Sequence, residues 1–406
     1  MSITICENIA MRYEISVEEA LAIINAEIKS LPGEIVALET AYSRVLAQNC
    51  VTQIDLPFYT TAAMDGWVVS GESPWQVIGE IKIGEISNTK LEVGQAMQIT
   101  TGGVIPEGSE AVIPWEIAKL NDKTLTGVIT KDANIRPSGA ECRAGETIFS
   151  HGAWLNSAKI GLLAATGHDE IFVTRKPKVS VICLGNELIH KGLPASGAIR
   201  DSLGIHLPSL LESLGADCLS REFSPDEIGK VLSAFESAVE KSDLIITTGG
   251  TADSNSDLVY SMLDHFKAEY LFNRVKVRPS YHILLSKIKF KDRDREVLVV
   301  SLPGNPQSAL AAFTLFGIPV LSKMLGTFKP KTEEIYLSEP VSTPKDFYRL
   351  IPGVINSRQF TPAEHIGSAM LRGLANSSGF ALVPPGSHSI GAEVTWLAFP
   401  GSNFGW

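Results

Sequence analysis

The chain has 406 residues, of which 44% are apolar and 20% are charged, and its formal net charge is -10. One hydrophobic core rarely serves a chain of this length, so we expect about two to four domains in a soluble globular protein. The negative charge argues against non-specific binding to nucleic acid or to an anionic membrane surface. An anionic substrate would therefore need a local basic site.

Cysteine usage and the N-terminal sequence favour a cytoplasmic location. The five cysteines are odd in number and form no C-x-x-C pair, which argues against a disulfide framework or a zinc site. The N-terminus lacks the basic and then apolar pattern of a secretory signal. The longest apolar run, 309–321, is interrupted by Gly317 and Pro319. It is shorter than the ~20 residues that span a bilayer, so we expect a buried helix and no membrane association.

The first predicted element is a helix that begins at the capping box Ser16-Val17-Glu18-Glu19. Apolar residues then recur at helical spacing as far as position 28. From Val51 to Phe149 the sequence changes to short β-rich segments separated by Gly, Pro and Asn, which predicts a separate, mostly β domain. Asn156 can cap a further helix that ends before Gly167. We expect this helix to pack on the N-terminal helix, which would make the β domain an insertion.

Residues 178–325 alternate between predicted strands and helices. Such alternation indicates a parallel sheet covered on both faces, with its ligand at the carboxyl ends of the strands. Beyond residue 330 the helical period disappears, and Pro, Ser and Gly separate short strands, which predicts a small terminal β domain. The predicted sheet strands are 179–183, 217–223, 244–247 and 297–302, and the predicted helices are 202–214, 225–240, 257–266 and the helix that contains residue 309.

Two of these strands end in glycine turns that lead into helices. The run 244–246 is followed by Thr247-Thr248-Gly249-Gly250-Thr251, and the run 297–300 is followed by Leu302-Pro303-Gly304-Asn305-Pro306. Turns of this kind expose free backbone N–H groups to an anionic ligand. Two of them in one sheet suggest a phosphate-bearing substrate. Taken singly, each is also explained by glycine's ability to make a tight strand-to-helix turn.

Six motifs together resemble one known family, and they follow its order and approximate spacing over most of the chain. These motifs identify the chain as a member of the MoeA family, the molybdopterin molybdenumtransferases, which includes the gephyrin E domain. The motifs are Ala63-Met64-Asp65-Gly66-Trp67, Thr100-Thr101-Gly102-Gly103, Pro106-Glu107-Gly108, Gly185-Asn186-Glu187-Leu188, Thr248-Gly249-Gly250 with Asp257, and Leu302-Pro303-Gly304-Asn305-Pro306.

The resemblance implies a multidomain α/β plus β fold. It comprises a central parallel α/β sheet domain that binds molybdopterin and is MoaB/MogA-like, an inserted mostly-β domain, a small helical or extended N-terminal domain, and a small C-terminal β-barrel-like domain. We expect these parts at 178–328, at 51–145, at 12–50 with 146–177, and at 329–406, respectively. The resemblance also implies an elongated homodimer whose active cleft is shared between the subunits.

The family resemblance further implies an enzyme of molybdenum cofactor biosynthesis. Such an enzyme binds adenylylated molybdopterin, cleaves its phosphate link with the help of a divalent cation such as Mg²⁺, releases AMP and inserts molybdate. A molybdopterin adenylyltransferase would be a partner. The implied catalytic residues are Asp65, Thr101, Glu187 and Asp257, with Glu187 and Asp257 as the metal ligands. The implied substrate-binding residues are Asp201, Ser202, Gly249, Gly250, Thr251, Arg278, Ser280, Pro303, Gly304 and Asn305, and molybdate would contact Arg278, Arg349 and Ser368.

Physical reasoning supports part of this set and leaves alternatives open. Glu187 and Asp257 each follow the carboxyl end of a predicted sheet strand, and such carboxylate pairs suit Mg²⁺. Alternatively, Asp257 is an acid stabilised by a helix N-terminus, and Glu187 is a solvated loop acid. Asp65 with Gly66 also fits a β-turn, and Ser202 and Asn305 are also suited to cap helices.

The chain departs from the family pattern around the expected molybdate site. The family usually has Lys-Pro-Gly-Lys-Pro where this chain has Arg278-Pro279-Ser280-Tyr281-His282. Arg278 can still hold an oxyanion with two N–H groups, whereas Tyr281 cannot supply the second lysine's charge. The loop after Gly250 reads Thr251-Ala252-Asp253-Ser254 in place of Val-Ser-x-Gly, and Leu203 replaces the usual asparagine.

These departures leave two main hypotheses. The chain is an active transferase, or it is a low-turnover paralogue that binds molybdopterin as a carrier or scaffold. A nucleotide-cleaving enzyme that shares only the sheet domain is a weaker alternative, because the segment around Asp65 and the terminal β domain also match the family.

Overall fold

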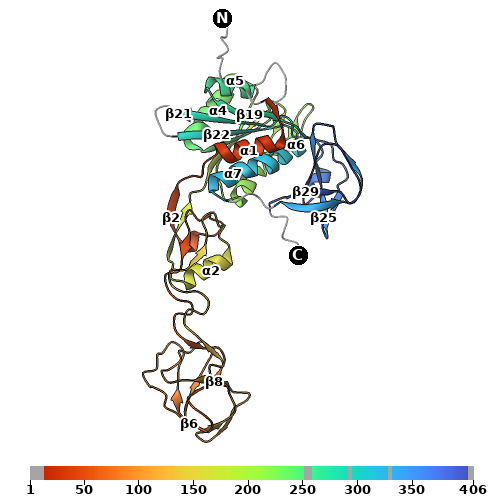
Figure 1. The fold of residues 1–406 in the computed structure, drawn as a ribbon. Helices are drawn as coiled ribbons and strands as arrows, with labels where there is room; N and C mark the ends of the chain where they lie inside the picture. The colour runs from red at the N-terminus through yellow and green to blue at the C-terminus, as the bar shows by residue number, and fades with distance from the viewer. Residues whose placement is uncertain (1–12, 251–257, 291–294, 328–331, 401–406) are drawn as a thin grey trace.

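The structure, a computed structural model, describes residues 13–250, 258–290, 295–327 and 332–400. The molecule is elongated (Figure 1). A large sheet with its helices and a C-terminal barrel lie at one end, a middle module follows, and a small β domain lies at the far end. We call the middle module and the far β domain together the arm, residues 33–174, and we call the far part the distal β domain.

The large sheet contains the four predicted parallel strands and extends beyond them. β14 pairs with β17 and β18, and β18 pairs with β22, all in parallel register. The antiparallel strand β21, together with β19 and β1, was not among the predicted sheet strands and completes the sheet. In order across the sheet, the strands are β1 (Tyr13–Ile15), β19 (Glu269–Val275), β21 (Leu284–Phe290), β22 (Arg295–Leu302), β18 (Leu244–Thr248), β14 (Lys178–Leu184) and β17 (Asp217–Ser224).

Helices cover both faces of this sheet, as the alternating pattern predicts. Successive strand residues point to opposite faces, so that Val181 joins one hydrophobic core and Ile182 the other. One core is shared with α1 (Val17–Glu27), α3 (Leu207–Ser213), α6 (Pro306–Ala312), the π-helical turn η2 (Phe313–Gly317) and α7 (Ile318–Leu325). The other is shared with α4 (Ile228–Lys241) and α5 (Leu258–His265).

The long apolar helix Pro306–Leu325 is part of the first core. Within the residues that the structure describes, it is the one helix long and apolar enough to cross a membrane, but 72% of its apolar window is buried inside the fold. The prediction of a buried helix over 309–321 is therefore confirmed.

The N-terminal helix α1 packs in a different place from the one we expected. Its capping box is present, with Ser16 and Glu19 each accepting a hydrogen bond from the other's backbone N–H. However, its buried residues contact the large sheet and α7. Helix α2 (Ser157–Ala165) packs instead on the short helix η1 (Leu38–Thr40), with Leu163 and Leu38 in one small core. The expected contact between α1 and α2 was wrong, because the sheet face offers α1 a larger apolar surface.

The arm is built from paired chain segments that run outward and return. β2 (Gly33–Ala37) pairs with β13 (Glu170–Thr174), β3 (Cys50–Val51) with β12 (Thr147–Phe149), and β4 (Thr61–Ala62) with β11 (Ile135–Arg136). The distal β domain therefore lies between an outgoing and a returning segment, like an insertion. Its sheet runs in the order β8 (Ala111–Pro114), β5 (Gly66–Val69), β7 (Gln95–Ile99), β6 (Trp75–Glu80), β10 (Thr124–Thr126) and β9 (Lys119–Asn121).

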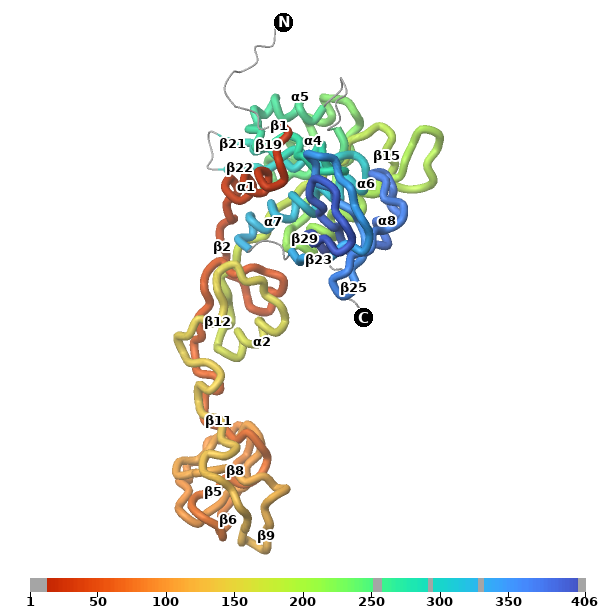
Figure 2. Tube along the Cα trace, turned by 45° about the vertical axis from the view of Figure 1, so that its right-hand side comes forward, coloured from red at the N-terminus to blue at the C-terminus, as the bar shows by residue number. Residues whose placement is uncertain are grey.

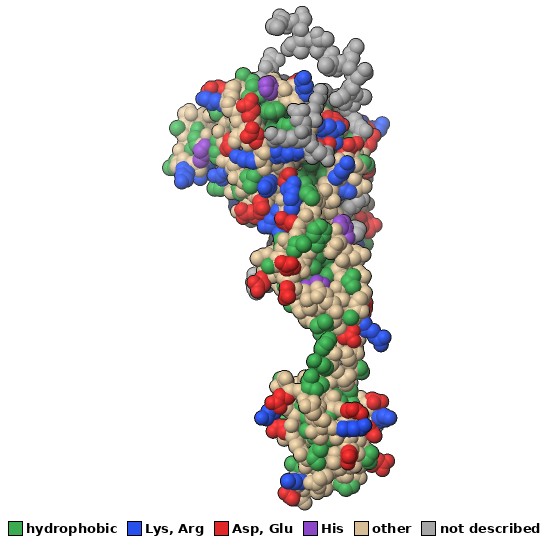
Figure 3. Space-filling view, turned by 90° about the vertical axis from the view of Figure 1, so that its left-hand side faces the viewer, with side chains coloured by type: hydrophobic (Ala, Val, Ile, Leu, Met, Phe, Trp, Pro, Cys, Tyr) green, Lys and Arg blue, Asp and Glu red, His purple; other side chains and the backbone are tan. Residues whose placement is uncertain are grey.

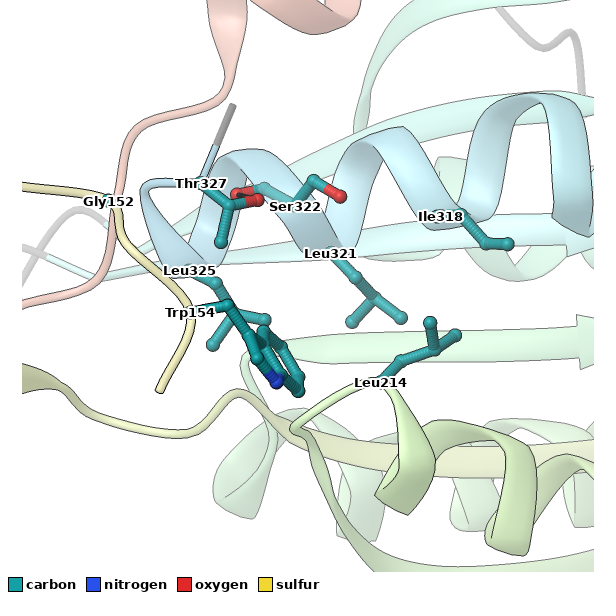
Figure 4. Close-up of a pocket in the computed structure, with 8 residues that line it drawn as sticks. All are labelled: Gly152, Trp154, Leu214, Ile318, Leu321, Ser322, Leu325 and Thr327. Atoms are coloured by element: carbon teal, nitrogen blue, oxygen red, sulfur yellow. Dashed lines mark hydrogen bonds between the residues drawn. The ribbon is translucent and has the colours of Figure 1, made fainter. Parts of the chain in front are cut away.

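The arm is connected to the large sheet by contacts of Arg175, Asp243 and Trp154, which we call the joint. Arg175, in the connection between β13 and β14, donates two hydrogen bonds to Asp243 at 2.6 and 2.7 Å, and the Lys178 amide donates a third at 2.9 Å. Nearby, the Trp154 ring lies against Gly215 and helix α7 (Figure 4). An apolar cavity of about 260 Å³ remains beside this ring.

The C-terminal region forms a small closed barrel, because β25 pairs with both β26 and β27. The strand β20 (Val277–Arg278), which follows β19 of the large sheet, adds to this barrel alongside β25. The predicted multidomain α/β plus β fold with a terminal barrel is confirmed, whereas the domain bounds given above stay predictions. The barrel strands are β25 (Tyr348–Asn356), β26 (Gln359–Pro362), β23 (Glu333–Leu337), β29 (Glu393–Ala398) and β27 (Gly379–Val383), with β24 (Val341–Ser342), β28 (Ser387–His388) and α8 (Arg372–Ala375) beside them.

Candidate active site

The two glycine turns lie side by side at the carboxyl edge of the large sheet. The Gly249 amide donates to the Leu302 carbonyl at 3.2 Å. A Cβ atom on Gly304 would lie 3.5 Å from Gly249 Cα, and one on Gly249 would lie 2.8 Å from the Leu184 carbonyl oxygen. Gly249 and Gly250 also have φ angles of 82° and 69°, which favour glycine. The ends of β14, β18 and β22 therefore meet at a backbone surface without side chains.

Glu187 lies in the loop that leaves the adjoining strand β14. Its carboxylate folds back over Gly185, where a Cβ atom would lie 2.6 Å from Glu187 Oε2. The side chain is exposed, and it forms no ion pair among the described residues. Thr251 and Asp257, the other predicted residues of this edge, lie outside the described residues. Within those residues, no group of three or more His, Cys, Asp or Glu side chains is placed to hold a metal ion.

Asp201 and Ser202 do not begin a helix, contrary to the expected helix at 202–214. Asp201 is 9% exposed, and its Oδ1 accepts the amides of Leu203 at 3.0 Å and Gly204 at 2.8 Å. These bonds close a turn, and α3 begins only at Leu207, with His206 in the N-cap position and Pro208 in the first turn. Ser202 is therefore not a helix cap. It lies half-buried beside the Asp201 turn.

Asn305 also makes no capping hydrogen bond, although it occupies the N-cap position of α6. Its side-chain amide instead reaches the Ser368 hydroxyl at 3.5 Å. The Ser368 carbonyl accepts the Gln307 amide at 3.1 Å, and Gln307 Nε2 donates to the Ile366 carbonyl at 3.1 Å. These contacts dock a barrel loop on the start of α6, next to the buried Pro303 and the exposed Gly304.

Arg278 and Arg349 lie next to each other where the large-sheet region meets the barrel. They are register partners in the parallel pair β20 and β25. Both line a polar pocket of about 150 Å³, together with Gln307. Arg278 is exposed, Arg349 is half-buried, and neither has an acidic partner among the described residues. Two adjacent guanidinium groups repel each other, so a bound anion would stabilise this arrangement.

Ser280 is closer to the core than its predicted role suggests. It is fully buried, and its hydroxyl donates to the Ser308 carbonyl at 2.9 Å. This bond ties the turn after Arg278 to helix α6. Gln307, which also lines the polar pocket, was not predicted as a site residue. Its only signal in the sequence is its place directly after the Leu302–Pro306 motif.

Asp65 and Thr101 lie together in the distal β domain, before β5 and after β7. Thr101 donates its amide N–H at 2.7 Å and its hydroxyl at 2.9 Å to Asp65 Oδ1. The backbone bond first, and then the hydroxyl bond, lowers the pKa of Asp65 below its usual value. The carboxylate is therefore charged at neutral pH. Figure 2 shows that β5 lies at the opposite end of the molecule from α6, so one chain does not bring Asp65 to the glycine turns.

The larger cavity at the joint is a poor match for an anionic ligand. Trp154, Leu214, Leu321 and Leu325 line it, and no charged side chain in the described part of the chain does (Figure 4). The structure thus brings the predicted residues together in two groups. One comprises Glu187, Gly249, Gly250, Gly304, Asn305, Ser368, Arg278 and Arg349 around the sheet edge and the barrel, and the other comprises Asp65 and Thr101 in the distal β domain.

Two family models match separate parts of the chain. A family model described as "MoeA N-terminal region (domain I and II)" matches residues 15–167, and one described as "Probable molybdopterin binding domain" matches residues 180–323. Together they cover more than half of the chain.

Curated relatives and solved structures match nearly the whole chain. A molybdopterin molybdenumtransferase of Staphylococcus aureus (strain Mu50 / ATCC 700699) is 29% identical over 95% of both chains. One of Staphylococcus epidermidis (strain ATCC 35984) is 29% identical over 85% of this chain and 84% of its own. The crystal structure of a molybdopterin biosynthesis MoeA protein from Pyrococcus horikosii is 26% identical, covers 97% of this chain and 100% of that chain, and superposes with a TM-score of 0.78. The chain belongs to the MoeA family, which consists of transferases of molybdenum cofactor biosynthesis.

Proposed function

We propose that this protein inserts molybdate into adenylylated molybdopterin and releases AMP in a Mg²⁺-dependent step. The observation that carries the proposal is the pair Arg278 and Arg349, which lack acidic partners among the described residues and line a pocket beside the docked start of α6. A paired-arginine pocket suits a small oxyanion, and the neighbouring glycine edge suits a phosphate.

Different residues of the site bind different parts of the substrates. Gly249, Gly250 and Gly304 offer backbone to the phosphate of the substrate, while Asn305 and Ser368 connect that edge to the oxyanion pocket. Arg278 and Arg349 hold molybdate near the dithiolene sulfurs that are to receive it. Asp201, Ser202, Thr251 and Pro303 complete the proposed substrate-binding set. Ser280, which is fully buried, supports that set by tying the turn after Arg278 to α6.

Glu187 fits a divalent-cation ligand, because it is an exposed carboxylate at the strand edge without an ion-pair partner in the described parts of the chain. Asp257 is the second proposed ligand. When bound, Mg²⁺ would neutralise negative charge that develops on the phosphate link. Asp65 is charged at neutral pH, so it acts as an acceptor for a proton or a cation, not as a proton donor.

We propose a homodimer in which the partner subunit supplies Asp65 and Thr101 to the cleft. The separation of the distal β domain from the large sheet of the same chain in Figures 1 and 2 supports this arrangement. The narrow part of the arm carries exposed apolar side chains, among them Val51, Phe58 and Tyr59. Apolar atoms gather along the same narrow part in Figure 3. We further propose a cytoplasmic location and a molybdopterin adenylyltransferase partner that supplies the substrate.

The first test measures turnover by purified protein. With adenylylated molybdopterin, Mg²⁺ and molybdate, we expect stoichiometric AMP release and active cofactor. Asp65→Asn and Glu187→Gln should each abolish turnover while leaving the circular dichroism spectrum unchanged. Tight pterin binding without AMP release would instead identify a carrier or scaffold, and wild-type rates in both variants would show that the site lies elsewhere.

The second test addresses the shared cleft. Asp65→Asn and Arg278→Ala alter opposite ends of the folded molecule. In a mixed dimer, one cleft would therefore carry both substitutions and the other would carry neither. After subunit exchange between the two inactive variants, we expect about a quarter of wild-type activity, because half of the dimers are mixed and each has one of two sites intact. No recovery, in a mixture that native mass spectrometry shows to contain mixed dimers, would mean that each cleft uses a single chain.

A further inference from the structure

Arginine and aromatic side chains alternate beside the oxyanion pocket. The alternating row comprises Tyr13 from β1, Arg274 from β19, Tyr281, Arg278 from β20 and Phe347 before β25, and we call it the arginine–aromatic row. It joins three separate chain segments, from the N-terminal strand to the edge of the barrel. Arg278, which lies between Tyr281 and Phe347 in this row, also lines the pocket.

Arg278 rests against two rings at once. Its guanidinium carbon lies 5.0 Å from the Tyr281 ring centre and 4.9 Å from the Phe347 ring centre, and the two ring centres are 5.7 Å apart. These three distances form a nearly equilateral triangle, so the guanidinium sits in the angle between the rings. Ring contacts of this kind use the face of the guanidinium and leave the N–H groups at its edge available to an oxyanion.

Tyr281 is itself fixed from the other side. Its hydroxyl donates to Glu14 Oε1 at 2.8 Å, and Glu14 lies in β1, which pairs with β19. Arg274 lies 5.6 Å from the Tyr281 ring centre and 4.7 Å from the Tyr13 ring centre. The Tyr281 carbonyl also accepts the Val275 amide at 3.1 Å. The ring therefore has a defined position even though it is only half-buried.

We propose that Tyr281 is a positioning residue for the oxyanion pocket, and that it holds the Arg278 guanidinium in the orientation that binds molybdate. This inference rests on the proposed function. A long, exposed arginine side chain loses rotamer entropy when it binds an anion. A ring that already restrains the guanidinium reduces this loss, so Tyr281 contributes to oxyanion affinity through orientation without contributing charge. Tyr281 cannot supply the second lysine's charge, and the proposed role needs none.

The test replaces the ring and measures molybdate binding and use by the full-length protein. Tyr281→Leu should raise the Kd for molybdate in calorimetry, and the KM for molybdate in the turnover assay, by about three- to tenfold, as loss of a cation–π contact predicts. The kcat at saturating molybdate should stay within about twofold, because the lost interaction is one of uniform binding. Tyr281→Phe keeps the ring and should restore most of the affinity.

A matched control removes a similar contact elsewhere. Tyr336 in the barrel lies 5.1 Å from the Arg358 guanidinium carbon, away from the pocket, so Tyr336→Leu should leave molybdate affinity unchanged. Phe347→Leu removes the second ring and should resemble Tyr281→Leu, which keeps the test decisive if the latter does not fold.

The outcomes separate the two proposals. Wild-type molybdate affinity in folded Tyr281→Leu or Phe347→Leu, together with loss of affinity in Arg278→Ala, would overturn the positioning role and leave the proposed function standing. Absence of molybdate binding and of turnover in the wild-type protein would overturn both. A wild-type KM with a lowered kcat in Tyr281→Leu would also contradict the proposal.

Discussion

The lowered pKa of Asp65 has its cause in one neighbouring residue, Thr101. Both hydrogen bonds that its Oδ1 accepts come from Thr101, one from the backbone and one from the side chain. The backbone bond is the larger cause of the lowered pKa and survives any substitution that keeps the turn. The hydroxyl bond can be removed alone, so the contribution of Thr101 is open to a simple measurement.

We predict that Thr101→Val shifts the acid side of the pH–rate profile to higher pH. A lowered pKa keeps Asp65 ionised as the pH falls, and loss of the hydroxyl bond raises that pKa toward its usual value, so protonation and loss of activity begin at higher pH. The profile of kcat/KM and the carboxyl NMR titration of Asp65 would measure both effects. Thr101→Ser keeps a hydroxyl and should retain the wild-type profile. An unchanged profile in Thr101→Val would show that the side chain does not tune Asp65.

At the scale of secondary-structure elements, the glycine turns combine two roles that can be separated. Gly249 is needed by the fold, since its φ is 82° and an added Cβ would lie 2.8 Å from the Leu184 carbonyl oxygen. Gly304 has no such angle, and among the described residues its Cβ would meet only Gly249 Cα, at an ordinary 3.5 Å. A side chain at Gly304 would therefore occupy the exposed edge without straining the backbone.

We predict that Gly249→Ala lowers the free energy of unfolding by about 1–2 kcal/mol, which is the usual cost of a left-handed conformation for a residue with a Cβ. Gly304→Ala should change stability by less than about 0.5 kcal/mol, as for an unstrained surface site. It should nevertheless weaken binding of adenylylated molybdopterin. Urea denaturation and pterin-binding titrations of both variants would measure these effects. Equal stability of the two variants would contradict the assignment of Gly249 to the fold.

The same elements explain which parts of the structure the sequence reveals. The strands that contain Val181, Ile246 and Val299 are predicted from buried apolar runs, because a fully buried parallel strand has no polar face to obscure it. Strands β19 and β21 are interrupted by the buried polar residues Asn273, Ser286 and Lys287, and they leave no periodic pattern. The partners of Asn273 and Lys287 come from elsewhere in the fold.

The site shows a similar division. The motifs identify Gly249, Gly304 and Asp65, since these residues serve a local turn or a recurring pattern. Phe347 acquires its proposed role only when the pairing of β20 with β25 brings its ring to Arg278, where it faces the Tyr281 ring. Such pairing joins segments about 70 positions apart in the chain, and no local pattern specifies it.

At the scale of the whole molecule, the joint fixes the arm to the large sheet. Asp243 accepts two bonds from Arg175 and one from the Lys178 amide. Burial is the largest influence and raises the pKa of Asp243, but the bonds from Arg175 and Lys178, with the charges of Arg175 and Arg295, together lower it below its usual value. The ionised form is therefore favoured by the folded protein.

We predict that Asp243→Asn destabilises the protein by about 2 kcal/mol at neutral pH, as for loss of charged hydrogen bonds in a partly buried site. Because the folded pKa is lowered, this stabilisation is present above the usual pKa near 3.8 and is lost as the pH falls through the folded value. Denaturation of both proteins at neutral and acidic pH would measure the difference. Asp217→Asn breaks the exposed pair with Lys176 and should cost less than about 0.5 kcal/mol. A constant difference across this pH range would contradict the prediction.

The joint lies at one end of the long, slender arm, and the distal β domain lies at the other end (Figure 1). Arg175, Asp243 and Trp154 lie at the joint, whereas Asp65 lies in the distal β domain, immediately before β5 (Figure 2). A rotation of a few degrees at the joint moves the joint residues very little but displaces the distal β domain in proportion to the length of the arm. The position of Asp65 relative to a cleft therefore depends on the stiffness of residues at the joint, which lie far from the reacting groups. Substitutions at the joint would lower the reaction rate by misplacing Asp65.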